Sequence, residues 1–289
     1  MSGLQGESDF AAMAPEPAPR SRWKRFSPSM GWRAFWSEIV IVVLGVVIAL
    51  AANEAVQDWS WRNKVEDAES RLRDDVAWTF LWAAEKYVSR PCVDAQLDAL
   101  ARNVLESGQR LKPAPVGSFS NVGYVVRMPN RPYRFPVWDA LVANGTATHL
   151  GQDRQAFLGR ISDAMAQARV SEAEGRRLFG RLLVMRDPIE LDAGVRADLL
   201  TQINELRTLT AFEALNAQQR MRTIVDAGSA PRTKVVEAFL HGPGTTASGG
   251  EFSGTVKFCK ARGLPLADWH DLEKVSSGNA FHPGAGVAK

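Results

Sequence analysis

The sequence predicts an all-α protein, with an N-terminal transmembrane helix that continues into a stalk. A bundle of about four helices follows, with one irregular or hairpin-containing loop. Three observations lead to this prediction. An apolar run near the N-terminus is long enough to span a bilayer. Apolar residues then recur at intervals of three and four over most of the chain. Alternating β-formers occupy only one short stretch. Of the 289 residues, 45% are hydrophobic and 23% are charged, which is typical of a folded protein.

The N-terminal region divides into a tail and an apolar segment. Residues 1–33 indicate a disordered cytoplasmic tail, because residues 1–19 show neither helical nor strand periodicity. The tail ends in a basic patch, which consists of Arg20, Arg22, Lys24, Arg25 and Arg33. Residues 34–56 form the predicted signal anchor. Within it, Trp36–Val56 would be about 31 Å long as a helix, which matches the hydrocarbon core of a bilayer. Tryptophans lie near both ends, as in the aromatic belts of membrane spans; they are Trp32, Trp36, Trp59 and Trp61.

Two other interpretations of the apolar segment stay open. It could be a buried core helix, or a signal peptide that is cleaved after Ala51. For an uncleaved anchor, charge sets the orientation. No acidic residue interrupts the basic patch, whereas acidic residues outnumber basic ones over residues 53–75. The positive-inside rule then places the N-terminus in the cytoplasm and the helical domain, residues 57–275, on the other side of the membrane. Residues 276–289 indicate a flexible tail.

Two short motifs carry a resemblance to other proteins. Residues 38–50 have the sequence E-I-V-I-V-V-L-G-V-V-I-A-L, and residues 138–145 have the sequence W-D-A-L-V-A-N-G. They are similar to the motifs E-I-x-I-V-x-x-G-V-x-I-A-L and W-x-x-L-x-x-x-G of an uncharacterised family of bacterial single-pass membrane proteins. The resemblance implies one span in the bacterial inner membrane and a mostly helical periplasmic domain. It transfers no activity and no catalytic residue.

The helical periodicity divides the outer domain into segments. The stalk is expected to continue to about Val88, where Ser89 and Pro91 predict a break and the start of a second helix. Prolines and alternating β-formers over Lys112–Pro136 indicate an ordered loop or a short hairpin. The further predicted helices cover residues 136–143, 157–185, 195–225 and 232–240, with a last helical piece around Phe258.

The two cysteines, Cys92 and Cys259, lie in the predicted outer domain, where a disulfide can persist. A bridge between them would close a long loop and stabilise the fold by at most about 5 kcal/mol. The alternative is two free thiols, each buried as a small apolar group.

The anchor carries a candidate helix-packing face. Its members recur at helical spacing, and two of them form a small-xxx-small pattern that lets two backbones approach closely; they are Glu38, Gly45, Ala49 and Ala52. This pattern predicts a helix dimer or contact with a partner span. The alternative is a stripe that faces lipid.

One loop is a candidate interaction surface, because arginine and aromatic residues are enriched at binding hot spots. Its candidate residues are Tyr124, Arg127, Arg131, Tyr133, Arg134 and Trp138. An envelope protein, anionic headgroups or an acidic cell-wall polymer could bind there. Alternatively, the aromatic side chains pack on the bundle and the arginines are only solvated.

No catalytic, cofactor-binding or metal-binding motif was found in the sequence. A net charge of +3 is too balanced for a dedicated nucleic-acid binder. The expected partners are the lipid bilayer and either a second copy or an envelope protein. The predicted function is that of a membrane-anchored periplasmic interaction module. A small-molecule-sensing helical bundle is the main alternative, and a membrane-anchored hydrolase is the least favoured one.

Overall fold

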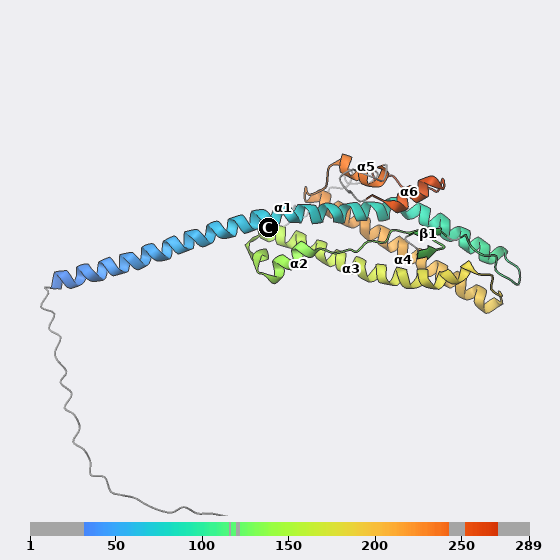
Figure 1. Ribbon diagram of the computed structural model, residues 1–289, viewed down its shortest axis with the longest axis horizontal. Helices are drawn as coiled ribbons and strands as arrows, with labels where there is room; N and C mark the ends of the chain where they lie inside the picture. Colours follow the sequence, from blue (N-terminus) through green and yellow to red (C-terminus); the bar gives the residue numbers. More distant parts are fainter. Residues whose placement is uncertain (1–31, 116, 120–121, 243–251, 271–289) are drawn as a thin grey trace, which may run out of the picture. The chain divides into compact units, whose positions relative to one another are not determined.

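The computed structural model describes residues 32–115, 117–119, 122–242 and 252–270 (Figure 1). The chain divides into two units, which meet between Gln57 and Asp58. The fold is all-α, as predicted. Nearly all of the predicted cytoplasmic tail, its basic patch apart from Arg33, and the predicted flexible tail of residues 276–289 lie outside the described residues.

The first element is the helix α1, Trp32–Glu106. Its N-terminal part, up to Gln57, belongs to the first unit. This part contains a window that is long and apolar enough to cross a membrane, and none of that window is buried within the protein. The exposed side chains there include valine, isoleucine and leucine, whose contact with water is unfavourable.

The helix α1 continues through Pro91, so the predicted break at Ser89 and Pro91 is wrong. Proline lacks an N–H donor and usually interrupts the helical ladder. Two carbonyls of the preceding turns accept additional hydrogen bonds. The Val88 carbonyl accepts from the backbone N–H of Ala267 at 3.0 Å, and the Ser89 hydroxyl donates to the Glu85 carbonyl at 2.7 Å. Buried side chains on both sides of the proline then stabilise one continuous helix.

The second unit contains all other elements. The expected hairpin consists of β1, Gly117–Phe119, and β2, Val122–Tyr124, which pair antiparallel. The α-helices are α2 (Pro136–Ala143), α3 (Gln152–Leu182), α4 (Ala193–Asp226), α5 (Thr233–His241) and α6 (Gly254–Ala261). Two short 3-10 helices, η1 (Thr146–His149) and η2 (Leu183–Arg186), follow α2 and α3. These positions confirm the helical stretches predicted after the loop.

Local sequence signals explain several helix ends. Pro136 begins α2, where its missing N–H costs nothing. Asn144 caps the end of α2, and Gly145 follows with φ of 78°, a backbone conformation that glycine adopts without strain. The Asp192 side chain accepts from the N–H of Val195 at 2.7 Å and caps the start of α4.

The three long helices pack together within the second unit, with α3 and α4 side by side along the later part of α1 (Figure 1). Their contacts form two hydrophobic clusters. One includes Leu72, Leu158 and Ile224, and the other includes Leu97, Leu182 and Ile203. On each helix the two clusters are separated by a short interval along the chain. On α3 and α4 these intervals contain the buried residues Glu172 and Glu213, and on α1 the buried Glu85 and Lys86 lie just before the interval. These charged residues define the surroundings of the candidate site.

Candidate functional site

A cluster of buried charges lies where the two hydrophobic clusters meet. Each long helix contributes one residue: Lys86 from α1, Glu172 from α3 and Glu213 from α4. The Lys86 ammonium donates to Glu172 Oε2 at 3.1 Å and to Glu213 Oε2 at 2.6 Å. All three side chains are at most 7% exposed. We refer to Lys86, Glu172 and Glu213 as the charge layer.

Burial and pairing act in opposite directions within the charge layer. Burial by itself lowers the pKa of Lys86, but the combined effect of Tyr133 and of the carboxylates Glu213 and Glu172 raises that pKa above its ordinary value. Burial also raises the pKa of Glu172, and the attraction of Lys86 offsets this only in part. The lysine is therefore held in its charged form, because two acidic side chains share it.

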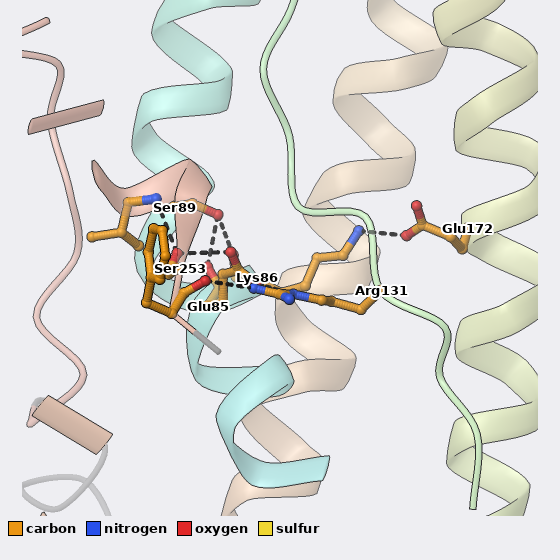
Figure 2. A network of polar contacts seen from close by, with 8 residues as sticks. Glu85, Lys86, Ser89, Arg131, Glu172 and Ser253 are labelled. Atoms are coloured by element: carbon orange, nitrogen blue, oxygen red, sulfur yellow. Dashed lines mark hydrogen bonds and ion pairs between the residues drawn. The ribbon is translucent and has the colours of Figure 1, made fainter. Parts of the chain in front are cut away.

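A second network joins the predicted interaction loop to α1 (Figure 2). Arg131 Nε donates to Glu85 Oε2 at 2.7 Å, and the Ser253 hydroxyl donates to Glu85 Oε1, also at 2.7 Å. A further bond of 3.2 Å runs from Arg131 Nη2 to the Phe252 carbonyl. Since Glu85 is buried, it needs these donors. The network therefore fixes the loop and the start of α6 to the same residue of α1, Glu85.

Beside this network lies a groove of about 1130 Å³. Four residues of the predicted interaction loop line it, namely Tyr124, Arg127, Arg131 and Arg134. The other two candidates lie elsewhere. Tyr133 is only 1% exposed, and Trp138 is partly buried and packs against the core. The loop thus divides its residues between the groove and the bundle.

Sequence reasoning missed the other side of the groove, which α3 supplies through Arg169, Arg176 and Phe179. Phe252 and Thr255, near the start of α6, complete it. The two arginines are seven residues apart, a spacing that places side chains on one face of a helix. That signal was present in the sequence, but nothing local connected it with the loop.

The groove is rich in positive charge. Three of its arginines, Arg134, Arg169 and Arg176, make no ion pair with any carboxylate in the described part of the chain. The two acidic residues that line the groove are already engaged, Glu85 with Arg131 and Glu172 with Lys86. We refer to this space as the arginine groove. Guanidinium groups beside aromatic rings suit a ligand that combines negative charge with apolar surface.

The side-chain amide of Gln96 fixes the position of the interaction loop beside the groove. The side chain of Gln96, on α1, accepts from the backbone N–H of Arg127 at 2.7 Å and donates to the Arg127 carbonyl at 3.0 Å. The Arg127 guanidinium lies 5.5 Å from the centre of the Tyr124 ring, within the range of a cation–π contact. These contacts set the position of the arginine before any ligand binds.

The remaining predicted sites lie outside the groove. Cys92 on α1 and Cys259 on α6 form a disulfide, and both are fully buried. Ala49 and Ala52 lie exposed on α1, as does Glu38, and Gly45 belongs to the same helix. Association through this packing face stays a prediction. Within the described ranges, His, Cys, Asp and Glu side chains form no group of three or more that could hold a metal ion.

The comparisons with known proteins assign no relative to this fold. No family model matches the chain, and no curated protein or solved structure matches it. The arginine groove is therefore interpreted from its own chemistry.

Proposed function

We propose that this chain is a single-pass membrane protein of the bacterial inner membrane whose periplasmic helical domain binds an acidic segment of another envelope protein. The arginine groove carries this proposal, because three of its guanidinium groups make no ion pair within 4.0 Å among the described residues. The proposal includes membership of an uncharacterised family of bacterial membrane proteins, whose motifs residues 38–50 and 138–145 resemble.

Three features support the location. The apolar window of α1 has no buried residue within the protein, and a bilayer would accommodate its apolar surface. The charges on either side of it favour a cytoplasmic N-terminus. The disulfide between Cys92 and Cys259 is compatible with an oxidising compartment such as the periplasm and unusual in the cytoplasm.

The lining of the groove favours a protein segment over other anions. Phe179, Phe252 and Met128 give the groove an apolar surface. A lipid headgroup or a glycan phosphate is polar and has no apolar group that could pack against it. Its volume of about 1130 Å³ lies above the usual range of small-molecule pockets, about 300–1,000 Å³. An acidic peptide with aromatic or aliphatic side chains matches both the charge and the apolar surface.

Site-specific crosslinking in intact cells tests the proposal. A photo-crosslinking amino acid at Asn130, an exposed residue of the groove, should form an adduct with one protein, identified by mass spectrometry. Arg134→Glu combined with Arg169→Glu should abolish that adduct, because both substitutions reverse charge in the groove without breaking an ion pair of the described structure. Arg131 is left unchanged, since reversing it would oppose the buried Glu85.

A matched control keeps the total charge constant. Arg102→Glu combined with Arg181→Glu makes the same charge change at two exposed helix positions outside the groove. This control should leave the adduct intact. An adduct that survives reversal in the groove, or one that contains only lipid or glycan, would contradict the proposal.

A further inference from the structure

A second, smaller cavity of about 250 Å³ lies between α3 and α4. Buried residues line its inner part, namely Lys86, Tyr133, Glu213 and Arg220. Exposed polar residues from the two helices line the outer part, namely Arg160, Gln167 and Gln219. We refer to this space as the Tyr133 cavity. A pocket between bundle helices with convergent polar groups is a common form of small-ligand site.

Two polar groups on residues that line the Tyr133 cavity lack hydrogen-bond partners within the described structure. Tyr133 Oη and Arg220 Nε are both inaccessible to solvent, and neither has a partner within the described residues. Their side chains belong to residues that are only 1% and 6% exposed. Leaving a buried donor unpaired is costly, and such groups are uncommon in folded proteins. The cavity therefore contains hydrogen-bonding capacity that the described chain does not use.

The hydrogen bonds of Arg220 indicate which kind of ligand its guanidinium group could bind. In the described structure, its guanidinium makes one hydrogen bond, from Nη1 to the Ala164 carbonyl at 3.2 Å, and no ion pair within 4.0 Å. The edge formed by Nε and Nη2 makes no hydrogen bond within the described residues, and that edge matches the two oxygens of a carboxylate or phosphate. Glu213, the acidic residue that lines the cavity, is engaged with Lys86 at 2.6 Å.

The backbone at Tyr133 is also unusual. Its φ of 41° lies in the left-handed region, which a bulky non-glycine residue rarely adopts. The ring lies between two cations, 5.8 Å from the Lys86 ammonium and 5.7 Å from the Arg220 guanidinium. Strain of this kind persists where surrounding contacts hold the residue in place, and it is concentrated at binding sites.

We propose that the Tyr133 cavity binds a small oxyanion, held by the Nε–Nη2 edge of Arg220 and the hydroxyl group of Tyr133. Arg160 at the outer part of the cavity adds a third positive charge and guides the anion inwards. The volume suits a ligand of modest size, since about eight waters would fill 250 Å³ at roughly 30 Å³ each. A small carboxylate and a free phosphate share this chemistry, and the experiment separates them.

The test uses the full chain in non-ionic detergent and two probes, sodium acetate and sodium phosphate. Titration calorimetry and the carbon-13 line width of labelled acetate measure binding directly. Sodium chloride at matched ionic strength and neutral glycerol are the controls. We expect saturable binding of at least one oxyanion, whereas chloride and glycerol leave the calorimetric signal unchanged. Preference for acetate identifies a carboxylate site, and preference for phosphate identifies a phosphate site.

Three variants locate the site. Tyr133→Phe removes only the hydroxyl, so the affinity should fall about tenfold, the size of one hydrogen bond of roughly 1.4 kcal/mol. The thermal midpoint without the anion should stay unchanged, because that hydroxyl has no partner in the described structure. Arg220→Gln should abolish binding. Arg181→Gln removes a positive charge from an exposed position of α3 outside the cavity and the groove, and it should leave binding unchanged.

Several outcomes would overturn the proposal. The absence of saturable binding by either anion would mean that only ordered water occupies the cavity. An equal response to chloride would indicate screening, and stabilisation by glycerol alone would indicate a neutral ligand. If Arg220→Gln does not fold, unchanged affinity in Tyr133→Phe and in Arg160→Gln would still reject the site. None of these results depends on the arginine groove, so they leave the proposed function untouched.

Discussion

At the scale of single residues, Lys86 lies at the centre of the charge layer. It is 7% exposed and holds two buried carboxylates that come from different helices. An ion pair of this kind stabilises little compared with apolar packing, but the loss of one partner leaves the others buried and unpaired. The charge layer thus makes the helix pairing specific, because a shift of α3 or α4 would separate Glu172 or Glu213 from Lys86.

Replacement of this lysine should be strongly destabilising. Lys86→Met preserves the apolar stem but removes the charge, so the free energy of unfolding should fall by about 3–5 kcal/mol. Denaturant unfolding followed by far-ultraviolet circular dichroism would measure the change. Arg102→Met, at an exposed position of the same helix, should change the free energy by less than about 0.5 kcal/mol. Equal effects of the two substitutions would contradict the role of the charge layer.

The raised pKa of Glu172 leads to a prediction about pH. A carboxyl group whose pKa is higher in the folded than in the unfolded state binds more protons when folded, so its contribution to stability falls as pH rises through the folded pKa. The stability of the wild type relative to Glu172→Gln should therefore increase as pH is lowered from about 7 toward the ordinary value of 4.5. Thermal midpoints of both proteins across that interval would check the sign; a constant difference would reject it.

At the scale of elements, the disulfide is the main covalent constraint on α6. This helix has eight residues, too few to be stable alone in water. Cys259 attaches it to Cys92 on α1, and Ser253 caps its first turn by accepting from the N–H of Val256 at 3.0 Å. Since Phe252 and Thr255 line the arginine groove, the position of α6 also sets one side of that groove.

Removal of the bridge should lower stability and release α6. The double variant Cys92→Ala, Cys259→Ala should lose about 2–5 kcal/mol of unfolding free energy, because the bridge closes a loop of 167 residues. Denaturant midpoints with and without reductant would measure this. The reductant should lower the wild-type midpoint toward that of the variant and leave the variant unchanged. A wild-type midpoint that does not respond to the reductant and equals that of the variant would contradict this role.

At the scale of the whole molecule, the proposed topology determines which partners the helical domain can meet. The exposed apolar part of α1 is long and apolar enough to cross a membrane. A domain outside the cytoplasm has access to envelope proteins and to an oxidising environment in which Cys92 and Cys259 stay paired. The cellular location of the helical domain should therefore be tested before its function.

A reporter fusion tests the topology directly. A periplasm-active enzyme fused after Lys289 should be active and should stay in the membrane fraction. Val43→Lys combined with Val47→Lys should move the fusion out of that fraction, because each charge at the centre of a span costs about 3 kcal/mol. An active but soluble wild-type fusion would indicate cleavage after Ala51. An inactive wild-type fusion would place the domain in the cytoplasm and contradict the proposed location.

The sequence by itself determined the local features of this protein. Intervals of three and four between apolar residues located the long helices, and Asn144 with Gly145 located the end of α2. These signals are local, because each depends on residues within a few turns of each other. For the same reason the local rule for proline predicted a break at Pro91, where buried packing keeps α1 continuous.

The tertiary structure alone decided which distant residues meet. It brought Arg131 and Ser253 to Glu85, joined Cys92 to Cys259, and placed α3 arginines opposite the interaction loop. It also separated two neighbours, turning Tyr133 into the core and Arg134 toward the groove. No periodic pattern encodes these contacts, since they depend on the path of the chain between helices and on the cost of burying a charge without a partner.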